Sequence, residues 1–359
     1  MGARPRLLLC IGEVLAHGGQ SRVVTREIES LREQFDVTLV VDRMCADTRV
    51  PVETVVLGSV GPWRDQHAVF RSLARAADVI HCHDSLRFMW WSSRAGRPWI
   101  VTSHGIAPLR YRPGLSSAAQ GAVTMAAYPR LYRKATAVVA ISDFIAAWLR
   151  RMGVSRVSVI RNGAPGLVAG DGRVPLQTDL LYIGEVSRRK GISDLVRMAR
   201  VLPETCTITV VGSGPMGGYL AAQSGRTSSA RVRYLGAVSD ATVDALLSSA
   251  FCTVSASYWE GFGLPIVEGF AHGRPALVRR TSGMAELVDA SGGGALFDSP
   301  EEAPDKVQWM QREWKDLSNL ASAYAASWSW ENAMAEYGRL LSEALGVGVS
   351  RSMGRNDDA

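Results

Sequence analysis

The segment from Ala250 to Pro275 constrains the possible folds of this chain more than any other. An apolar run of β-type residues, Ala250–Ser255, leads into a loop with two glycines, and a short apolar stretch then ends at Gly273. This order predicts a strand, a glycine-bearing loop and a helix. Pro265 lies where a first helical turn accepts proline, because the N–H group that proline lacks would have no intrahelical partner there.

The same loop is expected to bind an anion such as a phosphate. Gly261 and Gly263 leave backbone N–H groups uncovered by side chains, and a helix start adds unpaired N–H groups and the positive end of its dipole. Glu260 precedes the loop, and Glu268 lies about two helical turns further on. One carboxylate at the mouth and one deeper suit a ligand with a phosphate in the middle and hydroxyls on both sides.

Strand–helix units follow one another in two runs, each suited to a parallel sheet wrapped by helices. The 359 residues leave room for two domains. We place a first domain at residues 1–163, a linker at 164–176 and a second domain at 177–330. We expect a helix at 331–345 that crosses back to the first domain, and a disordered tail at 346–359.

Histidines lie at the ends of predicted strands in the first domain. His81 and His83 alternate to one face of a strand, and His104 ends the next strand, ahead of Gly105. Open α/β sheets bind ligands at the carboxyl ends of their strands, so we place His83 and His104 at a cleft. A metal site would need more ligands nearby, and we predict none.

Four other loops carry weaker signals. Gly18 and Gly19 stand just ahead of a predicted helix, where a glycine pair suits an anion but is more often only a turn. Ser142 is a good N-cap, and Asn162 lies in a turn cluster. The remaining loop has glycines 212, 214 and 217 in a G-x-G-x-x-G pattern after a strand, which alone argues for a dehydrogenase. The next strand lacks the ribose-binding acid at its end, so we interpret this pattern as a nucleoside-side loop.

Positive charge is concentrated in the first half of the chain. Residues 1–165 hold 22 Lys and Arg against 12 Asp and Glu, and residues 166–359 hold the remaining 18 and 22. No acid occurs between Asp84 and Asp143. A solubilising surface explains this, and so does a face that meets an anionic acceptor or an anionic membrane. No recognised nucleic-acid module accompanies the charge, so we expect no nucleic acid partner.

Composition excludes several classes of protein. No apolar run approaches the roughly 20 residues of a membrane span, and the start of the chain lacks the features of a signal peptide. We therefore expect a cytoplasmic protein, with membrane association left open. The five cysteines are scattered without a CxxC, which supports neither a disulfide framework nor a zinc ribbon. Lys190 stands out because the chain has few lysines, and its place after a strand suggests that a compact ammonium is needed there.

The motifs, taken in order, resemble those of the retaining GT-B glycosyltransferases, in particular glycosyltransferase family 4. The strongest is Glu260-x7-Glu268 with Gly-Phe-Gly-Leu-Pro inside it. The others are the Gly18-Gly19 loop, Thr102-Ser-His-Gly105, Ile160-Arg-Asn-Gly163, the loop from Gly184 to Lys190-Gly191, Val211-Gly-Ser-Gly-Pro215 and Tyr234-Leu-Gly236. The resemblance implies an α/β protein of GT-B architecture, with two Rossmann-like domains that face each other across a cleft.

The resemblance also implies roles for individual residues. As catalytic residues it gives Glu260, which binds donor-sugar hydroxyls near the reacting carbon, His104, which touches the donor sugar or guides the acceptor, and Lys190, which neutralises the diphosphate. The donor is held by Gly18, Gly19, Arg188, Lys190, Gly214, the amides of Phe262, Gly263 and Leu264, and Glu268, which accepts hydrogen bonds from the ribose. We assign His83, Ser142 and Asn162 to the acceptor side.

One position departs from the family pattern. Glu185 stands where the family has an arginine at the start of the phosphate loop, and a carboxylate there cannot bind a phosphate. Arg188 or Arg189 can supply the missing cation, and we choose Arg188. If neither reaches the phosphate, donor binding is weakened or the chain is an inactive relative.

The function expected from the resemblance is transfer of a hexose-type sugar from a nucleoside-diphosphate sugar, UDP-linked in our interpretation, to a hydroxyl of a glycan, glycolipid or small molecule. The chain has no Asp-x-Asp pattern, so we predict no metal, and the sugar nucleotide is a substrate, so no cofactor is expected. The alternatives are a nucleotide-sugar epimerase or hydrolase, a non-catalytic sugar-nucleotide-binding partner, a dehydrogenase, and a glycosidase that would use Glu260 and Glu268 on either side of one bond.

Overall fold

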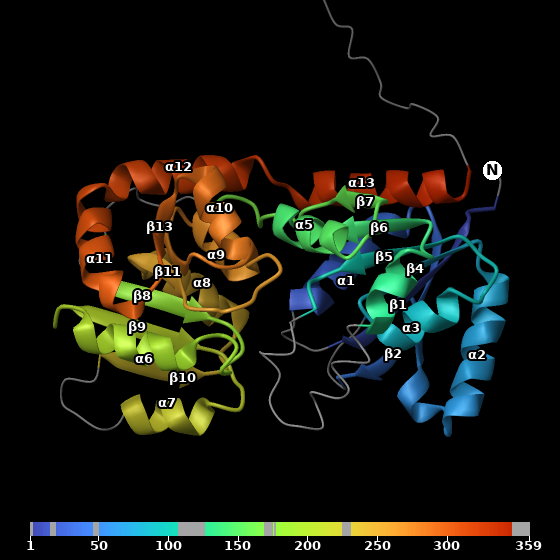
Figure 1. The fold of residues 1–359 in the computed structure, drawn as a ribbon, viewed down its shortest axis with the longest axis horizontal. Helices are drawn as coiled ribbons and strands as arrows, with labels where there is room; N and C mark the ends of the chain where they lie inside the picture. Colours follow the sequence, from blue (N-terminus) through green and yellow to red (C-terminus); the bar gives the residue numbers. More distant parts are fainter. Residues whose placement is uncertain are drawn as a thin grey trace, which may run out of the picture.

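A computed structural model describes residues 3–14, 19–45, 50–106, 126–168, 175, 177–224 and 231–346 of the chain. Two parallel sheets, one in each half of the sequence, form two α/β domains that lie side by side (Figure 1). The expected α/β architecture with two Rossmann-like domains is therefore confirmed. Gly18 and all but the first residue of the expected tail at 346–359 lie outside the described residues.

The sheet of the first domain has the strand order β3-β2-β1-β4-β5-β6-β7. Its strands are β1 (Arg6–Val14), β2 (Asp36–Met44), β3 (Glu53–Val56), β4 (Val79–His83), β5 (Trp99–Ser103), β6 (Ala137–Ala140) and β7 (Val157–Val159). Its helical elements are α1 (Gly19–Leu31), η1 (Leu57–Ser59), α2 (Trp63–Ala76), α3 (Leu86–Ser92) and α5 (Asp143–Arg151). The helix predicted after Gly18-Gly19 thus begins at Gly19 itself.

The sheet of the second domain has the order β10-β9-β8-β11-β12-β13. Its strands are β8 (Thr178–Ile183), β9 (Cys206–Val211), β10 (Val232–Gly236), β11 (Cys252–Ser255), β12 (Ala276–Arg279) and β13 (Gly294–Phe297). Its helical elements are α6 (Ile192–Val201), α7 (Gly217–Ser224), α8 (Asp240–Ser249), α9 (Leu264–Ala271), α10 (Gly283–Ser291), η3 (Pro300–Glu302), α11 (Ala303–Arg312) and α12 (Trp314–Ala326).

The central strands are buried on both faces, which is why they read as continuous apolar runs instead of alternating ones. Every residue of β4, β5 and β12 is buried. In each sheet the strand order reverses at one point, between β1 and β4 in the first domain and between β8 and β11 in the second. Ligands of open parallel sheets bind outside the carboxyl ends of the strands at such points.

The last helix, α13 (Trp330–Ala344), belongs spatially to the first domain, over which it runs in Figure 1. Its buried face includes Met334, Tyr337 and Leu341, which join the core cluster that also contains residues of β1 and β2. Ser329 caps the helix by accepting a hydrogen bond from the N–H of Asn332 at 3.1 Å. The chain therefore crosses between the domains twice.

The domains also touch directly. The carboxylate of Glu286, on α10, accepts hydrogen bonds from the backbone N–H groups of Asp143 and Phe144 at 3.1 and 2.8 Å, so it caps the start of α5 in the other domain. Ser142 donates its hydroxyl hydrogen to the carbonyl of Gly261 at 2.6 Å. α10 accordingly lies beside α5 (Figure 1).

Candidate active site

A cleft of about 1060 Å³ lies between the two domains. Its walls come from the carboxyl ends of strands in both sheets, from the start of α1 and from the loop that precedes α9. The two reversal points of strand order therefore face one shared space. The cleft is large enough for a nucleotide with a sugar attached.

The start of α9 lies in this cleft as the sequence predicted. Gly263 is the N-cap residue with φ of 110°, a conformation that favours glycine, and Pro265 occupies the first turn. A Cβ on Gly263 would overlap the side chain of Met284. Phe262, Gly263 and Leu264 all line the cleft, so the helix presents its positive end to whatever the cleft binds.

Lys190 and Glu260 come together at the mouth of this loop. The ammonium of Lys190 donates a hydrogen bond to Glu260, and both side chains are largely buried. Burial raises the pKa of Glu260, but the neighbouring Lys190 and Arg189 outweigh it and hold that pKa below its usual range. Glu260 is therefore a carboxylate at neutral pH, and it can accept hydrogen bonds from hydroxyl groups.

The missing cation of the phosphate loop needs a correction. Arg188, our choice from the sequence, is exposed and does not line the cleft, whereas Arg189 does. Arg189 donates to the carboxylate of Glu185 at 2.9 Å and to the carbonyl of Trp259 at 3.0 Å. The loop thus turns Arg188 to solvent and Arg189 to the cleft. The spacing of residues in the sequence did not reveal which of the two faces the cleft.

Glu268 lies deeper along α9 and lines the cleft. It forms an ion pair with Arg22 of α1, so the pair spans the two domains. Burial raises the pKa of Glu268, and the guanidinium of Arg22 opposes that shift. The resemblance gave Glu268 a role with the ribose, but Arg22 as its partner was not anticipated.

On the first domain, His104 lines the cleft together with Asp84. The backbone N–H of His104 donates to the carboxylate of Asp84 at 2.6 Å, and the hydroxyl of Tyr132 donates to the same group. Burial raises the pKa of Asp84 to about 6, although these hydrogen bonds work against the shift. Asp84 thus holds the loop that carries His104.

His83 is buried directly behind His104 and does not itself line the cleft. Its Nδ1 lies 2.8 Å from Nε2 of His104, and its Nε2 lies 3.0 Å from Glu27. Our prediction that His83 lies at the cleft was therefore wrong, because it lies behind His104. Sequence reasoning missed Glu27, although a signal existed: Glu27 falls on the stripe of α1 that also buries Val24, Ile28 and Leu31.

Glu27, His81 and His83 place one potential ligand atom each within 4.8 Å of one another. Hydrogen bonds from the two rings to the carboxylate already account for these contacts. We therefore describe Glu27, His81 and His83 as a hydrogen-bonded cluster. The family resemblance does not imply a metal at these residues.

The other predicted residues divide between the cleft and its support. Gly19 and Asn162 line the cleft. Ser142 lies behind it, where it joins the domains through Gly261. Gly214, with φ of 157°, packs so closely on Val186 that a Cβ there would lie 2.8 Å from the Val186 nitrogen. Its neighbour Gly212 lines the cleft instead.

The fold and the cleft define a two-domain α/β protein that presents a helix start, cations and carboxylates to one interdomain cleft. Two family models match it: "Glycosyltransferase Family 4" over residues 17–165 and "Glycosyl transferases group 1" over residues 174–327. The chain belongs to this family of glycosyltransferases.

Among curated proteins, the chain is 27% identical over 230 residues to glycogen synthase of Mycobacterium tuberculosis, covering 59% of this chain and 54% of that protein. It is 30% identical over 165 residues to O-antigen chain mannosyltransferase B of Escherichia coli, covering 42% of each. It is 26% identical over 189 residues to a GDP-mannose-dependent phosphatidylinositol dimannoside mannosyltransferase of M. tuberculosis, covering 51% of this chain and 48% of that protein. The chain thus spans about half the length of the curated relatives that it matches.

Solved structures show the same fold. HepE of Anabaena, crystallised with UDP, matches with a TM-score of 0.79 at 18% identity, covering 94% of this chain and 100% of that one. Sucrose-phosphate synthase of Thermosynechococcus elongatus matches with a TM-score of 0.77 at 20% identity, covering 96% and 100%. None of the described helices combines the length and the hydrophobicity of a membrane-spanning segment.

Proposed function

We propose that this protein is a retaining, metal-independent glycosyltransferase that moves a hexose-type sugar from a UDP-linked donor to a hydroxyl of an acceptor. The observation that carries the proposal is the meeting of Lys190, Glu260 and Glu268 around the start of α9 inside one interdomain cleft. This arrangement offers cations to a diphosphate and carboxylates to the hydroxyls on either side of it. Retention of configuration follows from the family resemblance.

The chemistry follows from where charge develops. Breaking the bond between the sugar and the diphosphate leaves negative charge on the departing diphosphate. The N–H groups at the start of α9 and the ammonium of Lys190 stabilise that charge in a site shielded from water. Because the sequence has no Asp-x-Asp pattern to hold a divalent metal, these groups supply the neutralisation in this proposal.

In this proposal the donor separates two ion pairs that line the cleft, Lys190–Glu260 and Arg22–Glu268. Lys190 would turn from Glu260 to the diphosphate, and Glu260 would then accept hydrogen bonds from the sugar hydroxyls. Glu268 would likewise exchange Arg22 for the ribose. HepE binds UDP and UDP-glucose, as its crystal structures record, which supports a UDP-linked donor here.

The test compares donors and variants directly. We expect release of nucleoside diphosphate from UDP-glucose, in the presence of EDTA and an acceptor mixture, to exceed release from GDP-mannose. Glu260→Gln and Lys190→Met should each lower kcat by about a hundredfold or more, without loss of folding. Lys315→Met is the matched control, since Lys315 is an exposed lysine of α12 that does not line the cleft. Rates in the two cleft variants equal to that of the control would refute the site.

One observation favours a second candidate, a non-catalytic sugar-nucleotide-binding partner. Arg189 is held by Glu185, so the cation that the phosphate loop needs is already partly neutralised. Tight UDP-glucose binding without turnover across a broad acceptor panel would favour this alternative. Product analysis without an acceptor separates both from an epimerase or hydrolase of the same fold.

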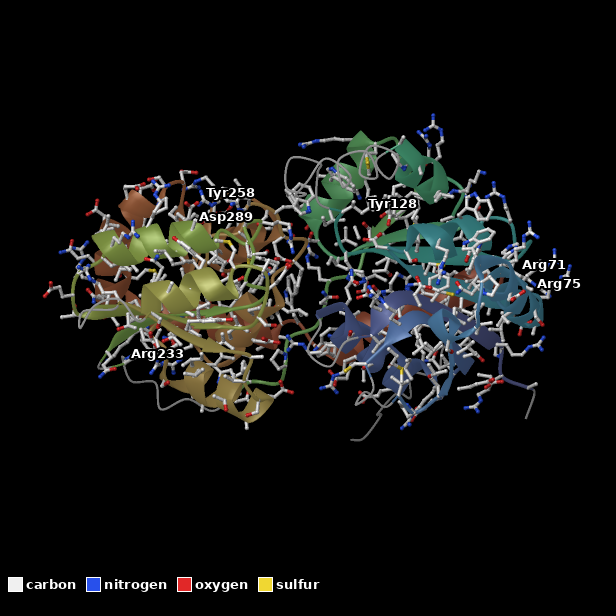
Figure 2. The ribbon with its side chains drawn as sticks, turned by 90° about the horizontal axis from the view of Figure 1, so that it is seen from below. Arg71, Arg75, Tyr128, Arg233, Tyr258 and Asp289 are labelled. Carbon is white, nitrogen blue, oxygen red and sulfur yellow. The ribbon has the colours of Figure 1, made fainter. Side chains whose placement is uncertain are left out.

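We also propose that the outer face of the first domain contacts anionic membranes. Trp63 and Trp90 are 50% and 36% exposed, and the guanidinium of Arg94 lies 4.1 Å from the ring of Trp90. Arg71 and Arg75 project from the outer edge of the same domain (Figure 2). Exposed tryptophans with arginines suit the interface of an anionic bilayer.

Flotation with vesicles of neutral and of anionic lipid tests this contact. We expect binding to the anionic vesicles alone, with weakening as salt rises because surface attraction is screened. Trp63→Ser should reduce binding, whereas Trp309→Ser should not, because Trp309 is a 38% exposed tryptophan on α11 of the other domain. Equal flotation of the two variants would contradict the assignment of this face.

A further inference from the structure

A chain of buried hydrogen bonds runs from the interior of the first domain to the cleft. It begins at Glu27 of α1, whose side chain is fully buried. One carboxylate oxygen contacts Nδ1 of His81, and the other lies 3.0 Å from Nε2 of His83. Nδ1 of His83 then lies 2.8 Å from Nε2 of His104, whose ring reaches the cleft.

The positions of the protons follow from the carboxylate. Burial raises the pKa of Glu27, but its contacts with His81 and His83 outweigh it and lower that pKa to about 2. An ionised carboxylate only accepts hydrogen bonds, so Nε2 of His83 carries a proton and donates it. Burial lowers the pKa of His83, which keeps its ring neutral. The Nδ1 atom of His83 therefore has no proton and acts as an acceptor.

The same reasoning fixes His104. Its Nε2 must donate to the bare Nδ1 of His83, and burial lowers the pKa of His104 well below its usual range, so this ring is also neutral. Its own Nδ1 is therefore unprotonated. That atom makes no hydrogen bond with the residues the structure describes, yet it is not a buried polar atom. Because His104 lines the cleft, we infer that this nitrogen is open to a ligand there.

We propose that Glu27 and His83 are positioning residues, which hold the ring of His104 in the tautomer that presents a hydrogen-bond acceptor to a hydroxyl group in the cleft. This deepens the proposed function, on which it rests for the identity of the hydroxyl, that of the donor sugar or of the acceptor. An unprotonated ring nitrogen accepts a hydrogen bond from a hydroxyl group but has no hydrogen to donate to a phosphate oxygen. His104 therefore distinguishes the sugar end of the donor from its diphosphate.

Two features indicate that this arrangement does more than satisfy the hydrogen bonds of buried polar groups. Asp84 fixes the backbone of His104 at 2.6 Å, while the Glu27–His83 pair fixes its ring, so the group is held from both sides. The orientation of a histidine ring and its tautomer are set by what its second nitrogen bonds. Among the described residues, the Glu27 carboxylate is the contact that keeps the proton of His83 on Nε2.

The first experiment reads the tautomers directly in the wild-type protein. Selective ¹⁵N-histidine labelling gives signals from six histidines, and His104→Gln identifies the signal of His104 by its loss. We expect His104 and His83 with unprotonated Nδ1 and protonated Nε2 at neutral pH. A protonated Nδ1 on His104, or a charged ring, would overturn the proposal. This readout needs no substrate, so it stands apart from the proposed activity.

The second experiment breaks the chain at one bond. In His83→Gln the amide reaches about where Nε2 was, so it can still donate to Glu27, while nothing replaces Nδ1. We expect the His104 signal to show exchange between tautomers, and kcat to fall on the order of tenfold to a hundredfold with donor KM within about twofold. Cys82→Ala is the control, because Cys82 is a buried residue of the same strand that bonds Ser92 instead. Unchanged kcat and an unchanged His104 signal in His83→Gln would refute the proposal.

Discussion

Gly261→Ala tests whether the spacing of the two domains matters for the chemistry of the cleft. Gly261 follows Glu260 and packs against the backbone of His104 in the other domain. A Cβ at this position would overlap the carbonyl oxygen of His104 and lie 3.0 Å from its carbonyl carbon and 3.3 Å from Cδ1 of Ile141. The substitution therefore pushes apart the side chains of Glu260 and His104, which lie in different domains.

The size of the effect follows from these distances. The overlap with the carbonyl oxygen of His104 is the most severe of the three contacts, and relieving it moves the domains apart by about 1 Å or more. A misplacement of about 1 Å at reacting groups costs on the order of a hundredfold in rate, or about 2.7 kcal/mol of transition-state stabilisation. Gly261 lacks a positive φ, so alanine adds no backbone strain, but one apolar cluster continues across the domain contact; we therefore expect the melting temperature to fall by several degrees without loss of folding.

The assay is kcat/KM for release of nucleoside diphosphate, with small-angle scattering to follow the separation of the domains. Gly218→Ala is the matched control, since Gly218 lies in α7 of the same domain and a Cβ there meets nothing within 4 Å. We expect this control to keep wild-type kcat/KM. Wild-type kcat/KM in Gly261→Ala, with normal folding, would refute the reasoning that close domain contact sets the catalytic geometry.

Three further predictions concern charged pairs. Because burial raises the pKa of Glu268, UDP affinity measured by calorimetry should fall as pH drops through that raised pKa, and Glu268→Gln should remove the dependence. Arg22→Met should tighten UDP binding by no more than about fivefold, since partly exposed ion pairs contribute about 0–1 kcal/mol; weaker binding would show that Arg22 itself holds the ligand. The folded-state pKa of Glu27 lies below its ordinary 4.5, at about 2. The ionised form of Glu27 therefore stabilises the fold fully above about pH 4.5. In urea titrations, the difference in the free energy of unfolding between wild type and Glu27→Gln should shrink as the pH falls from 4.5 towards 2.

The fold was predictable because its signals are local. Continuous apolar runs identify strands buried on both faces, and Gly263 with Pro265 marks the start of α9 before any tertiary contact is known. These features depend on backbone conformation, which neighbouring residues largely decide. The order of the family motifs along the chain predicts two successive runs of strand–helix units, and the structure has one parallel sheet in each half of the sequence.

The site was less predictable because side-chain direction depends on tertiary packing. Arg188 and Arg189 are adjacent in sequence, and only the path of the loop shows that Arg189 reaches the cleft. Glu27 was missed for a related reason. An acid on the apolar stripe of α1 signals a buried partner, but its partners lie on β4, more than fifty residues away.

Three ion pairs bring cations and carboxylates of the candidate site together. Lys190 is paired with Glu260, Arg22 with Glu268 and Arg189 with Glu185. Lys190 and Glu260 are largely buried, and leaving one partner of a buried pair without its counter-charge is costly, so a ligand that satisfies only the ammonium of Lys190 leaves Glu260 unpaired. A nucleoside diphosphate sugar brings oxygens for the cations and hydroxyls for the carboxylates in one molecule. These ion pairs therefore favour a ligand that carries both groups over inorganic diphosphate, which carries only one.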